Sequence, residues 1–148
     1  MLRITKLTDY GIVLLAHFAG EPEGTARSAR EMSQVTGLPA PVVSKMLKTL
    51  AGVDLLHSHR GAKGGYSLAR EPGQLTVAEI LERLEGPIAL MACSAGPGHC
   101  EVESSCQVRA PWQRINRAIL GTLERVTLAE LAEPAPGLLG IQGGSLPS

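Results

Sequence analysis

Residues 28–50 read SAREMSQVTGLPAPVVSKMLKTL, and this segment indicates two helices joined by a tight turn. Ser28 and Glu31 have the spacing of a capping box, in which each side chain satisfies a backbone N–H at the start of a helix. A short helix is therefore expected to begin here and to end at Gly37. Pro39 starts a second helix directly afterwards. Two short helices joined by a tight turn form a helix-turn-helix.

The second of these helices has two distinct faces. Four apolar residues recur at helical spacing and are expected to pack inward: Val43, Met46, Leu47 and Leu50. The opposite face is small, polar and basic. It carries Pro41, Ser44, Lys45 and Lys48. Such a face suits the major groove of double-stranded DNA, where Ser44 can reach a base edge while Lys45 and Lys48 contact phosphates.

A glycine-rich hairpin follows the two helices. Residues 55–59 and 66–69 are short strand-like runs, and Arg60-Gly-Ala-Lys-Gly-Gly65 lies between them. Glycine permits the positive φ angles of a tight hairpin. Arg60 and Lys63 place positive charge on it, and Arg60 is the candidate for insertion into a narrow minor groove. We therefore expect a mainly α fold with a small β-hairpin wing, a winged helix-turn-helix.

The distribution of charge supports a nucleic-acid partner, although the net charge is zero. Residues 1–70 carry nine Lys/Arg and five Asp/Glu, whereas residues 71–148 carry five Lys/Arg and nine Asp/Glu. This asymmetry indicates a front half that faces DNA and a back half with another task. Aromatic residues make up only 3% of the chain, which argues against binding of single-stranded nucleic acid by base stacking.

Two further helices are expected in the second half. Thr76 and Glu79 form a second capping box, which opens a helix that runs to Leu84. From Pro111 a longer helix begins, with apolar residues about every 3.5 positions, a spacing that suits packing against a helix of a second subunit. These residues are Trp112, Ile115, Ile119, Leu123 and Val126. The chain thus divides into a winged helix-turn-helix (1–90), a cysteine loop (91–109), a dimerisation helix (110–133) and a disordered tail (134–148).

The only cysteines of the chain, Cys93, Cys100 and Cys106, follow the pattern Cys-x6-Cys-x5-Cys. No stretch approaches the roughly 18 apolar residues that cross a bilayer. We therefore expect a cytoplasmic protein, in which cysteines serve as metal ligands or redox thiols rather than in disulfides. Thiolates favour zinc and iron–sulfur clusters, and the lack of a closely spaced Cys pair weighs against structural zinc. A thiol-based redox switch and three unrelated free cysteines are the alternatives.

The whole ordered chain resembles the Rrf-two family of winged-helix regulators, which includes the regulators of the isc and suf iron–sulfur assembly operons and nitric-oxide-sensing repressors. The motifs that carry the resemblance are Leu7-Thr-Asp-Tyr10, Gly37-Leu-Pro, Val43-Ser-Lys, His59-Arg-Gly-Ala-Lys-Gly-Gly-Tyr66 and the three-cysteine loop. The suf-operon subgroup is the most similar. Its signatures match the segments Leu2–Tyr10, Leu84–Ala89 and Trp112–Asn116.

This resemblance implies a homodimer that binds a partly palindromic DNA operator near its own suf genes. It also implies that Cys93, Cys100 and Cys106 ligate an iron–sulfur cluster, for which we favour 2Fe–2S over 4Fe–4S. Arg109 occupies the position of the histidine ligand of isc-type regulators. Asp9 matches an aspartate that reaches the cluster from the other subunit in nitric-oxide sensors. His99 is a second candidate for the fourth ligand, and the commoner role of an acid at the position of Asp9 is to stabilise a helix start.

The sequence therefore predicts an iron–sulfur-cluster-sensing transcription regulator, a repressor of cluster assembly genes. One alternative is a regulator controlled by zinc, by thiol oxidation or by nitric oxide. Another is a cluster-carrying assembly or redox protein whose basic face binds a protein. No enzyme signature is present: the chain lacks a nucleophile elbow, a phosphate loop and a dinucleotide fingerprint.

Overall fold

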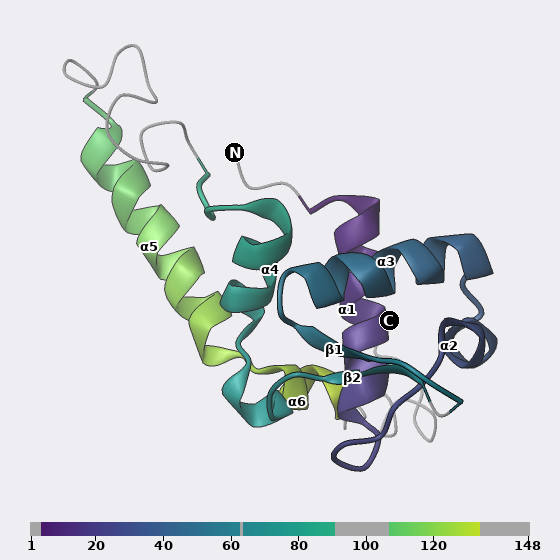
Figure 1. Cartoon of the computed structure of the whole chain (residues 1–148). Coiled ribbons are helices and arrows are strands. Elements are labelled where there is room, and N and C mark those ends of the chain that lie inside the picture. Colours follow the sequence, from purple (N-terminus) through teal and green to yellow (C-terminus); the bar gives the residue numbers. More distant parts are fainter. Residues whose placement is uncertain (1–3, 63, 91–106, 134–148) are drawn as a thin grey trace, which may run out of the picture.

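The computed structural model describes residues 4–62, 64–90 and 107–133. Helices dominate these residues, and a single two-stranded hairpin accompanies them (Figure 1). In chain order the elements are α1 (Lys6–Ala19), α2 (Ala29–Thr36), α3 (Ala40–Gly52), β1 (Leu56–His59), β2 (Gly65–Leu68), the 3-10 turn η1 (Pro72–Gln74), α4 (Val77–Glu85), α5 (Arg109–Arg125) and α6 (Leu128–Ala132). Within the described residues, every helix is too short or too polar to cross a lipid bilayer.

The helix-turn-helix forms as the sequence predicts. The Ser28 hydroxyl accepts the Glu31 N–H at 3.1 Å, and the Glu31 carboxylate accepts the Ser28 N–H at 3.4 Å, so both arms of the capping box are present. Gly37 ends α2 at φ +75°, a conformation that glycine adopts without strain. Helix α3 then begins at Ala40, with Pro39 in the N-cap position.

One hydrophobic core joins the helix-turn-helix to α1, the hairpin and α6. All four residues predicted to face inward from α3 belong to it, which confirms that assignment. Its buried members are Leu14, Leu15, Phe18, Met32, Val43, Met46, Leu47, Leu50, Leu55, Leu56, Leu75, Ile80 and Leu128. Helices α1 and α3 approach closely, because a Cβ at Gly11 would lie 2.9 Å from Cε of Met46.

The hairpin pairs β1 with β2 antiparallel, in a register that runs from Leu56 opposite Leu68 to His59 opposite Gly65. Strand β2 also bonds to the segment before α2, because Arg27 and Tyr66 exchange two backbone hydrogen bonds of 2.8 Å. This pairing needs a glycine at position 65: its φ is +144°, and a Cβ there would lie 2.5 Å from the Arg27 carbonyl oxygen. The glycines of the hairpin thus serve close backbone packing as well as the turn.

The capping box predicted at the start of α4 forms one of its two hydrogen bonds. The Thr76 hydroxyl accepts the Glu79 N–H at 3.1 Å. The Glu79 carboxylate instead accepts hydrogen bonds from Arg70 at 2.5 Å and Arg83 at 2.9 Å.

A second apolar cluster forms on the other side of α4, where it contacts α5. It contains Val77, Ala78, Leu81 and Ile88, with the half-buried Leu120, Leu123 and Val126.

The single helix expected over residues 110–133 is two helices. Helix α5 begins at Arg109 and ends at Arg125, since Val126 is extended and its carbonyl accepts the Val77 N–H at 2.9 Å. Helix α6 then turns back to pack against α1 and η1. Residues 127–133 therefore complete the core of the winged helix, although the predicted winged helix-turn-helix ended at residue 90. The tail over residues 134–148 lies outside the described residues.

Candidate DNA interface and cysteine site

The outer face of α3 presents the residues that the sequence selected for DNA. Lys45 and Lys48 are exposed and Ser44 is half-buried at the edge of the same face. Because Val43, Met46 and Leu47 are buried, this face cannot rotate inward without loss of the core. The small side chains on the outer face leave a low surface, which lets a groove of DNA approach the helix closely.

The wing carries Arg60, which is exposed just beyond the end of β1. Lys63, the second basic residue predicted there, lies outside the described residues. Strand β1 presents a polar surface, since His57, Ser58 and His59 are all exposed. His59 is fixed across the hairpin by a 2.7 Å hydrogen bond between its Nε2 and the Ser67 hydroxyl.

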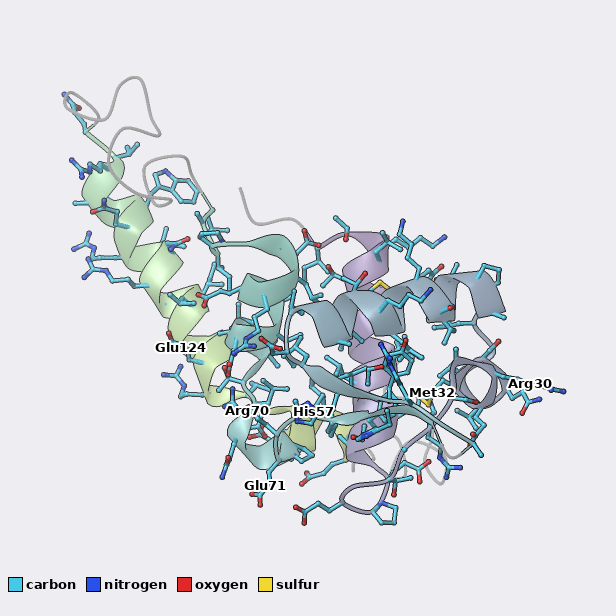
Figure 2. All side chains as sticks on the ribbon, viewed as in Figure 1. Arg30, Met32, His57, Arg70, Glu71 and Glu124 are labelled. Atoms are coloured by element: carbon cyan, nitrogen blue, oxygen red, sulfur yellow. The ribbon has the colours of Figure 1, made fainter. Side chains whose placement is uncertain are left out.

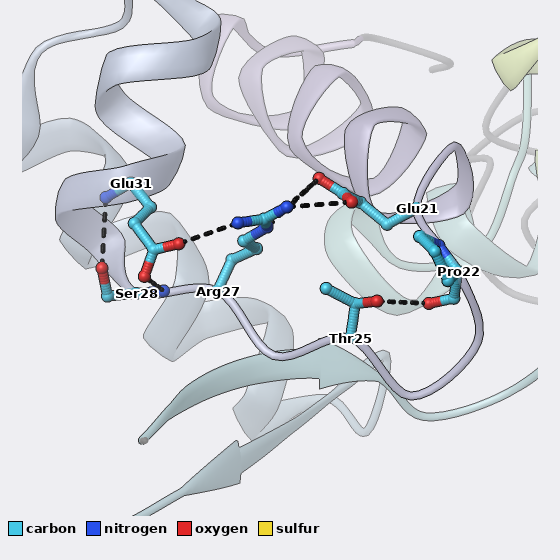
Figure 3. A network of polar contacts seen from close by, with 6 residues as sticks. All are labelled: Glu21, Pro22, Thr25, Arg27, Ser28 and Glu31. Atoms are coloured by element: carbon cyan, nitrogen blue, oxygen red, sulfur yellow. Dashed lines mark hydrogen bonds and ion pairs between the residues drawn. The ribbon is translucent and has the colours of Figure 1, made fainter. Parts of the chain in front are cut away.

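Arg27 is a basic residue whose charge is already committed within the fold (Figure 3). Its guanidinium donates to both carboxylate oxygens of Glu21 at 3.0–3.1 Å and to Oε2 of Glu31 at 3.0 Å. The hydrogen bond from Arg27, with those from Ser28, holds the pKa of Glu31 below its ordinary value of 4.5, while the two carboxylates raise the pKa of Arg27. Arg27 therefore fixes the loop before α2, and its charge is offset by two carboxylates.

Arg30 is a basic residue that the sequence analysis missed. It is exposed in the first turn of α2 and points away from the body of the protein (Figure 2). Its side chain makes no ion pair with another described residue. The position of Arg30 in the sequence is itself a signal. A cation in the first turn of a helix is unfavourable beside the positive end of the helix dipole, and a nearby anion relieves this cost.

Asp9 is exposed on α1, and its carboxylate makes no hydrogen bond or ion pair with the described residues. The cap of α1 is Thr5, whose hydroxyl accepts the Thr8 N–H at 3.2 Å. Glu85 reinforces this end: its Oε1 accepts the Thr8 hydroxyl at 2.5 Å and the Thr5 N–H at 2.9 Å. Asp9 is thus not needed as the N-cap, although its charge still suits the first turn.

The three cysteines and His99 lie outside the described residues. Within residues 4–62, 64–90 and 107–133, no group of three or more His, Cys, Asp or Glu side chains could hold a metal ion. Leu90 donates its N–H to Oδ1 of the buried Asn116 at 2.8 Å, and Gln107 leads directly into α5.

A family model, that of Rrf2, described as iron-dependent transcriptional regulator, matches residues 4–134. The chain belongs to the Rrf2 family. Rrf2 proteins are DNA-binding transcription regulators and not enzymes, so the winged helix described above is the DNA-binding part of such a regulator. The match confirms the family and the fold that the sequence predicted, and it extends through α6.

Solved structures of other Rrf2 regulators are similar to this chain over nearly its whole length. CymR (YrzC), the global cysteine regulator of B. subtilis, is 30% identical with a TM-score of 0.69, and the match covers 89% of this chain and 97% of CymR. The oxidized form of Staphylococcus aureus CymR is 26% identical with a TM-score of 0.66, covering 90% and 98%. IscR of T. potens is 26% identical with a TM-score of 0.65, covering 94% and 96%.

Proposed function

We propose that this Rrf2 regulator senses an iron–sulfur cluster and represses iron–sulfur cluster assembly genes, as the suf-operon subgroup does. The observation that carries the proposal is the presence of three cysteines within fourteen residues, in the segment that joins α4 to α5 of a winged helix. A protein of this kind acts where the DNA is, so we place it in the cytoplasm.

The available ligands fit such a cluster. Cys93, Cys100 and Cys106 supply thiolates, the donors that iron–sulfur clusters prefer. The fourth ligand is not assigned. Asp9 is one candidate, because its carboxylate is exposed and unpaired in the described chain. A bound cluster would supply a centre that responds to iron, oxygen or nitric oxide. An oxygen ligand in place of a fourth thiolate would leave one iron easier to reach.

The proposed DNA contacts use basic residues that make no ion pair within the described chain, together with Lys63, which lies outside it. Ser44 would meet a base edge in the major groove, while Lys45, Lys48 and Arg30 would contact phosphates. Arg60 would enter the minor groove, and Lys63 would support it on the wing. The operator would be a partly palindromic duplex, because we propose a homodimer that presents two such surfaces.

The test combines a spectrum with a binding assay. Protein purified without oxygen should show visible charge-transfer bands and bound iron, and it should retard a palindromic fragment from upstream of its suf genes. Mössbauer spectroscopy should assign the centre, for which we favour 2Fe–2S over 4Fe–4S. Colourless, iron-free protein that still retards the fragment would reject cluster sensing, while failure to bind any such fragment would reject the operator.

A second candidate function is regulation by thiol oxidation. It is favoured by the similarity to two CymR structures, one of them an oxidized form. The two functions give different results when iron is removed anaerobically and an oxidant is then added. A thiol switch predicts that operator affinity changes with the oxidant and not with iron. Membership of a family of transcription regulators leaves a cluster-carrying assembly protein without support.

A further inference from the structure

One carboxylate oxygen on α4 accepts hydrogen bonds from two arginines. Oε1 of Glu79 receives the Arg70 guanidinium at 2.5 Å and the Arg83 guanidinium at 2.9 Å. The Glu79 side chain is the least exposed of the three, at 27% against 39% and 35%. A single exposed ion pair contributes little to stability, whereas two cations that share one carboxylate form a network whose members depend on one another. The positions of both arginines are therefore tied to Glu79.

Arg83 carries this network to the end of α3. Its Nη1 donates at 2.7 Å to the carbonyl of Val53, the C-cap residue of α3. The carbonyl groups in the last turn of a helix lack partners within the helix, and they form the negative end of its dipole. Helix α3 has no basic residue in its own last turn. The guanidinium of Arg83 supplies both a donor and a positive charge there, so α4 holds the C-terminal end of α3.

Arg70 carries the same network to the base of the wing. It follows the end of β2 at Leu68 by two residues, and its Nη2 donates to the Gln74 carbonyl in η1 at 2.6 Å. Strand β2 pairs with β1 along the hairpin, and the Ala69 N–H donates to the Leu55 carbonyl at 3.2 Å. The backbone thus connects Arg70 directly to the hairpin, and Glu79 joins the hairpin to the end of α3.

We propose that Glu79 is a positioning residue for operator binding, whose carboxylate keeps α3 and the wing in a fixed orientation relative to each other. The inference rests on the function proposed above, in which Ser44 on α3 meets the major groove and Arg60 on the wing meets the minor groove. Two elements that enter different grooves at once must keep the spacing between them. Without the Glu79 charge, the two guanidinium groups at that oxygen repel each other, and Arg83 is no longer held at the end of α3.

Two substitutions test the shared carboxylate. Glu79→Met keeps the length and the helix propensity of the side chain and removes the acceptor, whereas Glu79→Gln keeps a neutral oxygen in the same place. Glu82→Met is the matched control, because it makes the same change on α4 at an exposed residue whose side chain bonds to no other described residue. Fluorescence anisotropy gives the affinity of each full-length protein, purified without oxygen, for two duplexes. One is a palindromic fragment from upstream of its suf genes, and the other is a scrambled duplex of the same length. Both are measured well below the Tm of each variant.

In Glu79→Met we expect operator affinity to fall about tenfold, a coupling of the size found between residues of one hydrogen-bond network. Affinity for the scrambled duplex and the salt slope should stay the same, because the network supplies no phosphate contact. Glu79→Gln should lose less, and Glu82→Met should behave as the wild type. Arg83→Ala should also weaken operator binding, and its combination with Glu79→Met should add little, since both changes break the same junction.

Unchanged operator affinity in Glu79→Met would overturn the positioning role and leave the proposed operator intact. An equal loss on both duplexes would also overturn it, because a fixed orientation matters only where both grooves are read. Additive losses in the Glu79→Met, Arg83→Ala double variant would show that the two residues act separately, which contradicts the inference. Wild-type protein that binds both duplexes equally would reject the proposed operator and this inference together.

Discussion

At the scale of single residues, the side chains divide into those committed within the fold and those left for a partner. Arg27 and Arg70 are held by carboxylates, although the sequence counts them in the basic half. Arg30, Lys45 and Lys48 make no such ion pair within the described chain. The positive charge available to DNA is therefore smaller than the sequence count. In the described chain, α2 and α3 carry Arg30, Lys45 and Lys48, and the wing carries Arg60.

Lys48→Ala tests whether this charge meets phosphates. The substitution should weaken binding to all DNA sequences alike and lower the slope of log affinity against log salt by about one unit. Arg83→Ala is the control, because it removes a charge that is bonded to Glu79 and to the Val53 carbonyl. It should leave the slope unchanged. Binding measured by fluorescence anisotropy over a range of salt gives both values, and an unchanged slope for Lys48→Ala would place α3 away from the phosphates.

The stability of the contact between α1 and α4 should depend on pH through Glu85. The hydrogen bonds from Thr8 and Thr5 hold its pKa below the ordinary value of 4.5. The stabilisation is therefore present above pH 4.5 and is lost as the pH falls through the lowered pKa. Glu85→Gln should melt at a lower temperature than the wild type at pH 7, and this difference should shrink towards pH 3. Glu82→Gln, on the same helix and exposed, should show no such trend in calorimetry.

At the scale of elements, the short helix α6 is part of the winged helix although it is remote in the sequence. The Leu128 N–H donates to the Leu75 carbonyl at 2.8 Å, and its side chain is fully buried in the main core. Helix α6 packs against α1 and η1. The break between α5 and α6 is what returns the chain to the core.

Leu128→Ala should destabilise the DNA-binding half. Removal of a fully buried leucine side chain costs about 2–5 kcal/mol, because contacts are lost and a cavity is left. Leu131→Ala, in the same helix but 41% exposed, should cost less than about 1 kcal/mol. Urea denaturation followed by circular dichroism gives both values. Equal and small effects would show that the winged helix folds without α6.

At the scale of the whole molecule, α5 lies along the outer side of α4 and extends beyond the rest of the described chain (Figure 1). The burial of its apolar residues differs along its length. Near the C-terminal end, Leu120 and Leu123 pack against α4 of the same chain. Towards the N-terminal end, Val108 and Ile115 are 50% and 45% exposed. This second part is the surface that we propose for a second subunit.

Ile115→Glu should separate the subunits while each one stays folded. The side chain is exposed in the single chain, so the charge costs little there, but a buried and unpaired carboxylate at a dimer interface is costly. Arg117→Glu introduces a carboxylate at an exposed position on the opposite flank of α5 and serves as the control. Sedimentation equilibrium should give a monomer for the first variant and a dimer for the second. A dimer in both would place the interface elsewhere, and palindrome binding should be lost only with the dimer.

The local structure of the helix-turn-helix could be predicted from the sequence. The Ser28 capping box, the glycine at position 37 and the apolar spacing along α3 are interactions between residues close in the chain, and all three formed as predicted. The family resemblance drawn from such motifs was confirmed in the same way. The cysteine pattern also came from the sequence, and the cluster that it predicts stays a prediction.

The partners of residues far apart in the sequence depend on how the fold packs. The Glu79 carboxylate bonds to Arg70 and Arg83 rather than to the Thr76 N–H, because the fold brings two guanidinium groups to it. The helix predicted over residues 110–133 broke at Val126 because backbone bonds to Val77 and Leu75, together with burial of Leu128, favour a return to the core. The hydrogen bond between Leu90 and Asn116 joins residues 26 positions apart. No local pattern encodes such a contact, because it depends on how α4 and α5 pack.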